Sequence, residues 1–465
     1  MSNTIRLTEA QHRDLLEHLH CGDGKEAVAI ALCGRCGENK RTLLVHKIVP
    51  IPYEDCSVRE SDRVTWSSNL LPPLLEEARK NNWGVVKFHS HPGGYLDFSD
   101  YDNESDRLLF PRLYDWIGTS HVNASVIVTP DGKMNGRIVS PKGNFLPIKS
   151  IWLIGSDIKQ LSHSFDHLGS SIPAFGERIS QTFGDKTFSI LEGLKVAVVG
   201  CSGTGGPVIE QLVRNCVGEL ILVDPDHIDE GNLNRIPNSK FEDAVNKIPK
   251  VEMHSNAING IGLNTKVTTF NCDLFNPGTV RALSDCDIIF GCMDTVDGRH
   301  LLNKLATYYL IPYFDVGVKL VADGSGGISQ VCCQTHYLQP GLSTLYSRKV
   351  YTMEQLQAAV LYRTDLSTYE AQKKEGYIDG VNVDKPAVVS VNTLAASIAV
   401  NDLLARLHPY RRADNAKIAT TMISLTDMFM AYNPESGPCE MLLGCVGLGD
   451  TPLLLNTPEL SEVEQ

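Results

Sequence analysis

The feature that most constrains the fold is a regular alternation that begins near Gly193. Five short apolar runs, each of strand length, are separated by segments long enough for a helix: KVAVVG, ELILVD, KVTTF, DIIFGC and PYFDVG. Strands that alternate with helices in this way predict a mostly parallel sheet with helices on both faces. The later apolar run AVVSVNTLAASIAVNDLLARL predicts a further helix.

A glycine-rich turn after the first of these strands is a candidate nucleotide site. In KVAVVGCSGTGGPVIEQL the strand is followed by four glycines and then by a helical pattern: Gly200, Gly203, Gly205 and Gly206. Such a turn lets the backbone approach a phosphate chain and presents helix N-terminal amides to it. Asp224 ends the next strand, where a carboxylate binds ribose hydroxyls. These features suit NAD as well as ATP, and a glycine cluster alone also occurs in purely structural turns.

Polar residues further along favour ATP over NAD. Asn232 and Arg235 follow in DPDHIDEGNLNRIPNS, Lys250 in IPKVEM, and Asp294 in GCMDTVDGRHLLN. Cations stabilise charge on the α-phosphate during attack and help pyrophosphate to leave, which an NAD site does not require. Asp294 ends a strand and is placed to hold Mg²⁺. An NAD-dependent oxidoreductase remains the disfavoured alternative.

This ordered set resembles the ThiF/MoeB superfamily of ubiquitin-like-protein activating enzymes over residues 176–430. The resemblance implies a Rossmann-like, doubly wound α/β domain that adenylates the C-terminal glycine of a ubiquitin-like or sulfur-carrier protein. It assigns Asp224 to the ribose and Asp294 to Mg²⁺. The phosphates would be bound by Asn232, Arg235 and Lys250.

The chain departs from that family at two places. The arginine pair before the first strand appears as ERISQTFG, which keeps Arg178 and has Gln181 in place of the second arginine. Many members of that family hold a structural zinc with two Cys-x-x-Cys pairs. Where the first pair would lie, this chain has QPGLSTLYSR, which contains no cysteine, so we expect no second zinc. Cys33 and Cys36 form a Cys-x-x-Cys in CGRCGENK, which we interpret as a structural hairpin turn.

The cysteines bear on the step after adenylation. Activating enzymes of the ubiquitin type carry a nucleophilic cysteine in the region where this chain has none, between Cys333 and Cys439. Cys332 and Cys333 lie in a strand-like run, where at least one should pack inward. We therefore expect the acyl-adenylate to pass directly to a thiol on another protein, such as a conjugating enzyme or another thiol acceptor.

A second cluster of reactive residues lies in HSHPGGYLDFSDYD. His89 and His91 are two apart at the end of the predicted strand WGVVKFHSH, so both side chains leave the same face. With Asp102 as a third ligand they would leave one position of a zinc ion for water, whose pKa the metal lowers toward ~7. Ser99 and Asp102 also fit a helix capping box, and paired histidines are also found as plain surface residues. Two histidines, a serine and an aspartate at this fixed spacing are expected by chance about 0.002 times in a chain of this length.

The spacing His-x-His, seven residues, then Ser-x-x-Asp resembles the signature of the JAMM (MPN/JAB) zinc metallopeptidases, over residues 1–150. The resemblance implies an α-β-α domain in which His89, His91 and Asp102 bind zinc and Ser99 stabilises the oxyanion. Its general base is an upstream glutamate on an early strand, a position that Glu26 in EAVAIALCG resembles. Three other glutamates lie in turn-like or polar sequence and are weaker rivals: Glu38, Glu54 and Glu60.

Composition and organisation bound the remaining possibilities. We expect a connection over 151–175 and an acidic tail over 431–465 beside the two domains. A formal net charge of −13 argues against a nucleic-acid or anionic-membrane binder. No apolar stretch approaches the roughly 18–20 residues of a membrane helix, and the start lacks the apolar region of a secretory signal. Thirteen cysteines then indicate reduced thiols or metal ligands, so we expect a cytoplasmic protein.

The two resemblances together imply a bifunctional enzyme. It would adenylate the C-terminus of a ubiquitin-like protein ending in Gly and cleave (iso)peptide bonds at such C-termini with a zinc-bound water, as in bacterial ubiquitin-like conjugation operons. One alternative is activation of a sulfur carrier for cofactor or sulfur-metabolite biosynthesis, which the missing cysteine favours. Another is a non-catalytic scaffold, against which the intact ligand set argues. The ThiF/MoeB family often pairs through its adenylating domain, so the resemblance is compatible with a homodimer.

Overall fold

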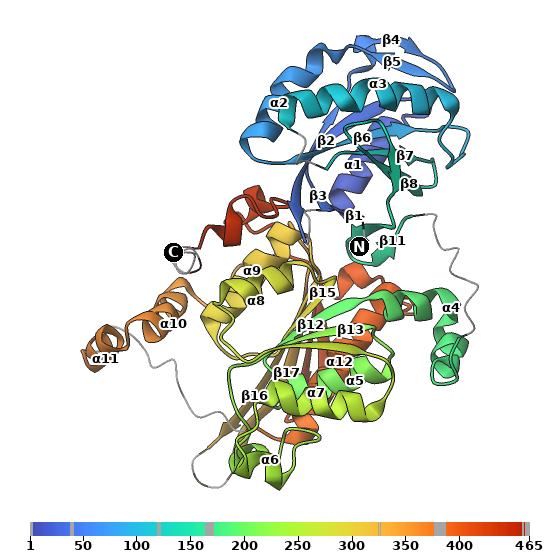
Figure 1. The fold of residues 1–465 in the computed structure, drawn as a ribbon. Coiled ribbons are helices and arrows are strands. Elements are labelled where there is room, and N and C mark those ends of the chain that lie inside the picture. The colour runs from blue at the N-terminus through green and yellow to red at the C-terminus, as the bar shows by residue number, and fades with distance from the viewer. Residues whose placement is uncertain are drawn as a thin grey trace. The chain divides into compact units, whose positions relative to one another are not determined.

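The protein is described by a computed structural model that covers residues 3–37, 41–118, 122–162, 172–323, 325, 327–375, 387–457 and 460. The chain divides into two compact units, drawn in Figure 1. The first unit is Met1–Ser171 with Tyr308–Leu310 and Cys445–Asn456, and the second is the remainder. Among the helices of the described residues, none combines the length and the apolar character needed to cross a membrane.

The first unit is built on a nine-stranded sheet in the order β11-β10-β1-β3-β2-β6-β7-β8-β9. Its strands are β1 (Thr4–Thr8), β2 (Val28–Cys36), β3 (Thr42–Pro50), β6 (Gly84–Ser90), β7 (Ala124–Val128), β8 (Met134–Val139), β9 (Phe145–Pro147), β10 (Ser150–Ile154) and β11 (Ile158–Gln160). The helix α1 (Glu9–Leu19) packs on one face, and α2 (Leu71–Lys80) and α3 (Asp100–Ile117) pack on the other. A small hairpin, β4 (Cys56–Arg59) and β5 (Val64–Trp66), completes the unit. The expected α-β-α architecture is confirmed.

Strand β6 decides where the reactive side chains point. Val86 and Phe88 enter the core beneath α1, whereas Val85 packs into the core beneath α2 and α3. Because side chains alternate along a strand, Lys87 and His89 share the face of Val85. The end of β6 therefore brings His89 under α3.

The sequence misplaced two features of this unit. Strand β2 continues through Cys36, so Cys33 and Cys36 lie buried in a strand and not in a turn. They pair with Val45 and Thr42 of β3. The predicted connection over 151–175 is in part sheet, because the apolar run Ser150–Ile154 pairs in parallel with β1 as β10.

The predicted tail over 431–465 is also not a simple tail. Residues 445–456 belong to the first unit, where Val446 lies against β3 and the His46 Nδ1 is 2.6 Å from its carbonyl oxygen. The amide of Asp450 donates to the carbonyl of Arg35 on β2 at 3.0 Å. This part of the chain is a packed segment of the N-terminal unit.

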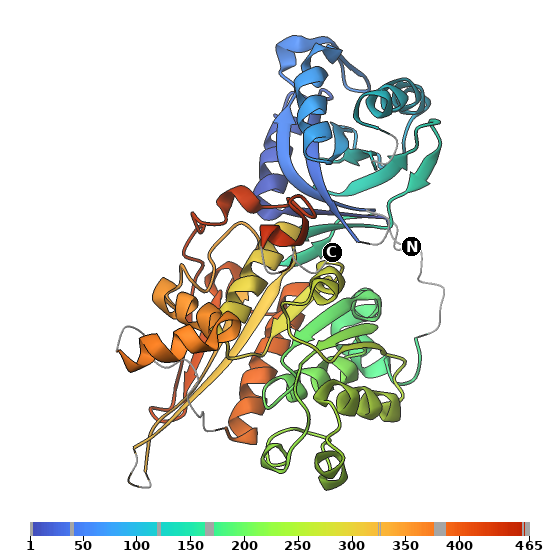
Figure 2. The ribbon, with the colours of Figure 1, turned by 60° about the vertical axis from the view of Figure 1, so that its left-hand side comes forward.

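The second unit contains an eight-stranded sheet in the order β14-β13-β12-β15-β16-β17-β18-β19. The strands are β12 (Lys195–Val199), β13 (Glu219–Val223), β14 (Lys266–Phe270), β15 (Ile288–Gly291), β16 (Tyr313–Ala322), β17 (Ile328–Leu338), β18 (Thr420–Ser424) and β19 (Phe429–Asn433). The first five in that order are parallel and the last three run antiparallel. In Figure 2 the long pair β16–β17 extends away from the parallel part of the sheet.

The helices of this unit are α4 (Glu177–Gly193), α5 (Gly205–Arg214), α6 (Phe241–Val245), α7 (Lys250–Ile261), α8 (Pro277–Ser284), α9 (Val296–Tyr309), α10 (Met353–Thr364), α11 (Leu366–Lys374) and α12 (Val389–Leu407). Helices α5 and α12 pack against each other. Strand order reverses between β12 and β15, and the carboxyl edge at such a reversal is where open α/β sheets bind ligands. All five strands named from the sequence are confirmed, as is the doubly wound fold.

Candidate functional sites

The metal cluster is assembled by one strand end and one helix start. His89 is the last but one residue of β6, and His91 follows directly after the strand. Helix α3 begins after Ser99, whose Oγ accepts from the amide of Asp102 at 3.1 Å. In return, Asp102 Oδ2 accepts from the amide and hydroxyl of Ser99 at 2.8 and 2.7 Å. The capping box therefore exists, and it holds Asp102 facing the two histidines.

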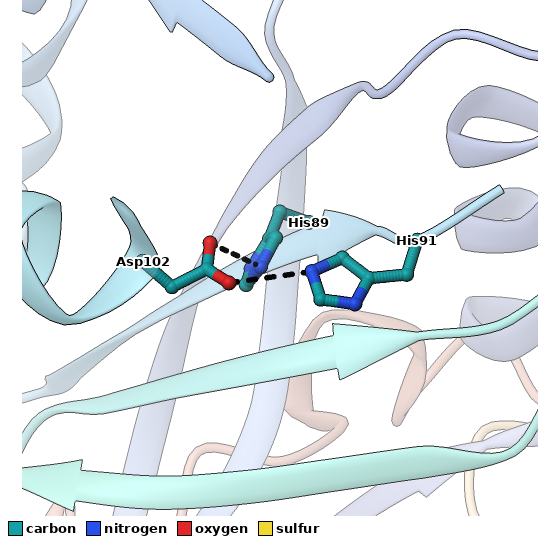
Figure 3. Close-up of side chains that lie close together, drawn as sticks. All are labelled: His89, His91 and Asp102. Atoms are coloured by element: carbon teal, nitrogen blue, oxygen red, sulfur yellow. Dashed lines mark ion pairs between the residues drawn. The ribbon is translucent and has the colours of Figure 1, made fainter. Parts of the chain in front are cut away.

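The three side chains converge on one point, as Figure 3 shows. Their candidate ligand atoms all lie within 4.8 Å of one another. His89 Nε2 is 3.0 Å from Asp102 Oδ1, and His91 Nε2 is 3.4 Å from Asp102 Oδ2. The rings of His89 and His91 meet edge to face with centroids 5.0 Å apart.

The hydrogen bonding of the imidazoles fits a metal ion. His89 is buried. Its Nε2 lies 3.0 Å from Asp102 Oδ1 but is poorly aligned for a hydrogen bond, and its Nδ1 has no hydrogen-bond partner among the described residues. Buried polar atoms are normally paired, so such an orphaned nitrogen indicates a missing ligand. His91 Nδ1 donates to the carbonyl of Tyr95 at 2.8 Å, which leaves Nε2 free to bind a metal. Two imidazoles and a carboxylate match the donor set of catalytic zinc sites.

Glu26 lies beside this cluster. It precedes β2, is buried, and places Oε1 4.0 Å from His91 Nε2. Burial raises the pKa of Glu26 to about 7, against the opposing charge of His91. Burial alone would also raise the pKa of Asp102, but its contacts with His89 and His91 hold that pKa well below the usual range. One carboxyl is thus suited to exchange a proton near neutral pH while the other stays ionised.

The rival glutamates differ in their surroundings. Glu60 pairs with Arg63 at 3.3 Å and contributes its backbone carbonyl, which accepts from the Glu26 amide at 2.7 Å. Glu54 is exposed, and Glu38 lies outside the described residues. Among the described rivals, neither Glu54 nor Glu60 forms an ion pair with the histidines.

The glycine turn of the second unit is tightly built. Gly200 has a positive φ of 88°, and a Cβ there would stand 2.8 Å from the carbonyl oxygen of Cys292. A Cβ on Gly205 would overlap the carbonyl oxygen of Gly200. Asp224 is buried at the end of β13, and its Oδ2 accepts from the amide of Cys201 at 2.7 Å. The carboxylate therefore braces the turn from the neighbouring strand.

The polar residues expected around the phosphates surround this turn in part. Lys250 Nζ lies 2.7 Å from Asp226 Oδ2 and 3.9 Å from Asp224 Oδ1. Asn232 is buried and its Oδ1 has no partner among the described residues. The side chain of Arg235 lies beside Gly203, with Cδ 3.5 Å from where a Cβ would stand. This amide oxygen is a hydrogen-bond acceptor, so it suits a donor group of a ligand and not a phosphate oxygen.

The remaining two predicted residues are placed differently. Asp294 lies in the exposed loop between β15 and α9, after the strand that pairs with β12. It is thus on the carboxyl edge of the sheet that carries the glycine turn. Arg178 is exposed in the first turn of α4, and among the described residues no hydrogen bond or ion pair joins it to the turn.

Sequence reasoning missed two residues that contact the turn. His254 on α7 donates from Nε2 to the carbonyl of Cys201 at 2.9 Å. Asn392 on α12 is buried against Gly203, whose Cβ would overlap the Asn392 amide. No spacing rule connects residues this far apart in the chain, so only the fold reveals them.

The buried histidine makes the turn sensitive to acid. Burial lowers the pKa of His254 to about 4, so the folded chain keeps it neutral while the unfolded chain takes up a proton below 6.5. Stability is therefore lost as pH falls from 6.5 to 4, by about 3 kcal/mol at 1.4 kcal/mol per pH unit. His254→Gln retains a donor without titrating, so its α5 amides should lose less protection from hydrogen exchange between pH 7 and pH 4.5. Equal losses in variant and wild type would contradict the assignment.

Two protein-family models match the chain. The model described as the ThiF family matches residues 176–436, more than half of the chain. The chain belongs to the ThiF family. A second model, prokaryotic homologs of the JAB domain, matches residues 8–137. This ThiF-family chain thus carries a JAB-type domain at its N-terminus, and both resemblances found in the sequence are confirmed.

Curated relatives match the ThiF part. The adenylyltransferase and sulfurtransferase UBA4 of Meyerozyma guilliermondii is 31% identical over 152 residues, 32% of this chain and 33% of that protein. Ubiquitin-like modifier-activating enzyme 5 of Culex quinquefasciatus is 26% identical over 168 residues, 34% of this chain and 40% of that protein. The SAMP-activating enzyme E1 of Haloferax volcanii is 28% identical over 118 residues, 25% of this chain and 43% of that protein. The chain spans about a third of the length of the first of these relatives.

Solved structures also align with the chain. The Escherichia coli MccB structure with succinimide covers 58% of this chain and 73% of its own, at 16% identity and a TM-score of 0.42. The complex of E. coli MccB with MccA-N7isoASN covers 60% and 76%, at 18% identity and a TM-score of 0.46.

Proposed function

We propose that this ThiF-family chain is a two-activity enzyme of a bacterial ubiquitin-like conjugation system in the cytoplasm. Its ThiF part adenylates the C-terminal carboxylate of a ubiquitin-like protein ending in Gly, and its JAB part hydrolyses peptide or isopeptide bonds at such C-termini. The observation that carries the proposal is the presence in one chain of the braced glycine turn and of the buried His89–His91–Asp102 cluster beside Glu26.

The adenylation step follows from the charges around the turn. A substrate carboxylate oxygen attacks the α-phosphorus of ATP, which forms an acyl-adenylate and releases pyrophosphate. The α5 N-terminus and Arg235 would stabilise the negative charge that develops on the phosphates. Lys250 would leave its ion pair with Asp226 to bind the phosphates, Asn232 would donate to them from its amide nitrogen, and Asp294 would hold Mg²⁺. Asp224 would bind the ribose while it braces the turn.

The hydrolytic step uses the residues of the JAB part. His89, His91 and Asp102 would hold a zinc ion, which when bound acidifies a water molecule and polarises the scissile carbonyl. Glu26 accepts the water proton and passes it to the leaving amine, a role suited to a carboxyl whose Oε1 lies 4.0 Å from His91 Nε2. Ser99 would stabilise the oxyanion through its hydroxyl, which donates to Asp102 Oδ2 at 2.7 Å.

The base assignment predicts a separation of zinc binding from hydrolysis. Glu26→Gln removes the proton acceptor and retains the size of the side chain. We expect zinc content to stay at the wild-type level and hydrolysis of a linear ubiquitin-like fusion to fall about 100-fold or more. Glu60→Gln, next to the base in the fold but directed toward Arg63, is the matched control and should hydrolyse normally. Loss of zinc in Glu26→Gln would instead make Glu26 a ligand.

The test of the adenylation proposal is ATP–pyrophosphate exchange with a panel of ubiquitin-like proteins ending in Gly-Gly. Exchange that depends on one member supports activation and identifies the partner. No exchange with any member, from folded protein, would refute it. Sedimentation of the same sample shows whether the chain pairs as a homodimer.

Sulfur-carrier activation is the second candidate, favoured by the absence of cysteine between Cys333 and Cys439. It shares the adenylate and differs in the acceptor, since a sulfur donor converts the adenylate to a thiocarboxylate. Mass spectrometry of the partner after reaction separates the two, because a thiocarboxylate and an isopeptide conjugate differ in mass. A scaffold without catalysis would bind no zinc and give no exchange.

A further inference from the structure

Three buried charges lie next to the metal cluster and have no part in the proposed reaction. Asp106 is fully buried, and Lys87 and Arg137 expose 6% and 7% of their side chains. Lys87 Nζ donates to Asp106 Oδ1, and Arg137 donates to Oδ2 through Nε at 3.1 Å and Nη2 at 2.6 Å. A buried ion cluster contributes little net stability, because desolvation offsets the attraction between its members. A contribution to stability alone therefore does not explain why three charged side chains are buried here.

The sheet register places the triad directly behind the metal ligands. Lys87 on β6, Ser125 on β7 and Arg137 on β8 are paired across three neighbouring strands. His89 lies two residues beyond Lys87 on the same face of β6. On α3, Asp106 follows Asp102 by one helical turn, so both face the sheet. The triad is thus built from the same strand and the same helix as the ligands.

Arg137 also holds the chain on both sides of Ser99. Its Nη1 donates to Asn103 Oδ1 at 2.5 Å, and its guanidinium lies 3.7 Å from the ring centre of Phe98. The capping box, by contrast, is local and ties Asp102 only to Ser99.

The apolar core contacts of α3 come from its second half. The α3 residues in the core cluster beneath this face are Phe110, Leu113 and Ile117, with Leu109 packed beside them. All of these follow Asp106, whereas Asp102 lies in the first turn. Beside the contact of Asp102 with His89, the N-terminal half of α3 is therefore joined to β6 and β8 by the buried ion pairs of Asp106 and by the Arg137–Asn103 hydrogen bond.

We infer that Lys87, Asp106 and Arg137 are positioning residues of the metal centre, which set the separation of Asp102 from His89. The inference rests on the proposed zinc function and deepens it. Residues that orient metal ligands from outside the coordination sphere typically change metal affinity by about 10- to 100-fold when they are altered. The triad acts through geometry, since each of its hydrogen bonds joins a strand to the helix that carries Asp102.

The test uses Arg137→Lys in the full-length chain. Lysine keeps the charge but cannot reach Asp106 and Asn103 together, as the guanidinium does. We expect the dissociation constant for zinc, measured by competition with a chromogenic chelator, to rise about 10- to 100-fold. The visible absorption of the Co²⁺-loaded protein should change, because the ligand separation changes. In the metal-free protein, the amides of the first turn of α3 should exchange faster.

The matched control is Arg35→Lys. Arg35 is another buried arginine of this unit, and its Nε donates to the carbonyl of Asn82 at 2.9 Å. It lies on β2 seven residues from Val28, the partner of His89, at roughly 23 Å along the strand. Zinc affinity of this variant should equal that of the wild type. Asp106→Asn, which leaves an oxygen acceptor for Lys87, should weaken zinc binding in the same range as Arg137→Lys.

Two results would overturn the inference. One is wild-type zinc affinity and an unchanged Co²⁺ spectrum in both Arg137→Lys and Asp106→Asn. The other is an equal loss of affinity in Arg35→Lys, which would mean general loosening of the unit. A wild-type protein that takes up no zinc would refute the proposed function itself, and the inference with it, so the two failures are distinguishable.

Discussion

Asp294→Ala is expected to lower ATP–pyrophosphate exchange at least about 100-fold while zinc-dependent hydrolysis stays at the wild-type rate. Asp294 follows β15, whose partner β12 leads into the glycine turn, so its carboxylate stands on the edge where the triphosphate would bind. A carboxylate there would hold Mg²⁺ against the phosphates, and removing one such charge stabiliser typically slows a reaction by about 10²- to 10³-fold. We expect hydrolysis to be unaffected, because the residues proposed for it lie in a separate compact unit.

Asp285→Ala is the matched control for this prediction. Asp285 is also a partly exposed aspartate, with 41% of its side chain exposed, and it pairs with Lys195 at 3.2 Å. Lys195 is the first residue of β12, so this pair lies at the opposite edge of the sheet from the glycine turn. Exchange should persist in Asp285→Ala. Normal exchange in Asp294→Ala would remove Asp294 from the site and leave the Mg²⁺ ligand to another residue.

Local patterns account for what was predicted from the sequence. The five strands of the second unit are continuous apolar runs, because a parallel strand covered on both faces requires them. The convergence of His89 and His91 could be predicted because side chains two residues apart on a strand point to the same face. The capping box of Ser99 and Asp102 could be predicted because both residues lie within one helical turn.

Contacts between distant segments account for what was missed. Gly34 suggested a turn, yet it lies in β2, where a Cβ would overlap the backbone of Gly447 and Leu448. A side chain is excluded at position 34 by a segment of the first unit that lies more than 400 positions further along the chain. Strand β10 was missed for a similar reason, since its partner β1 lies at the start of the sequence.

The positioning triad had a weak signal in the sequence. Lys87 interrupts the apolar run of GVVKFHS and lies two positions before His89. A buried strand tolerates such a charge only when a partner neutralises it. The partners Asp106 and Arg137 could not be chosen from spacing, because pairing Lys87 with both depends on the register of β7 and β8.

His91→Ala is expected to release the zinc and abolish hydrolysis, with ATP–pyrophosphate exchange unchanged. The variant removes the ligand atom Nε2, 3.4 Å from Asp102 Oδ2, and leaves two ligands, one short of the three protein ligands of catalytic zinc sites. Zinc content by atomic emission should fall from stoichiometric to background, and cleavage of a linear ubiquitin-like fusion should fall below detection. The unit itself should stay folded, because His91 lies at the end of β6 and outside its apolar cores.

His12→Ala serves as the comparison that tells ligation from disturbance. His12 lies on α1, on the other face of the sheet, and its Nε2 is 3.2 Å from the carbonyl of Gly132. It should keep zinc and hydrolysis. If His91→Ala retained zinc, the cluster of Figure 3 would be an ordinary histidine–aspartate contact, and the hydrolytic half of the proposal would be wrong. If His91→Ala instead lost exchange as well as zinc, the two units would depend on each other in catalysis, because the substitution lies outside the unit that carries the glycine turn.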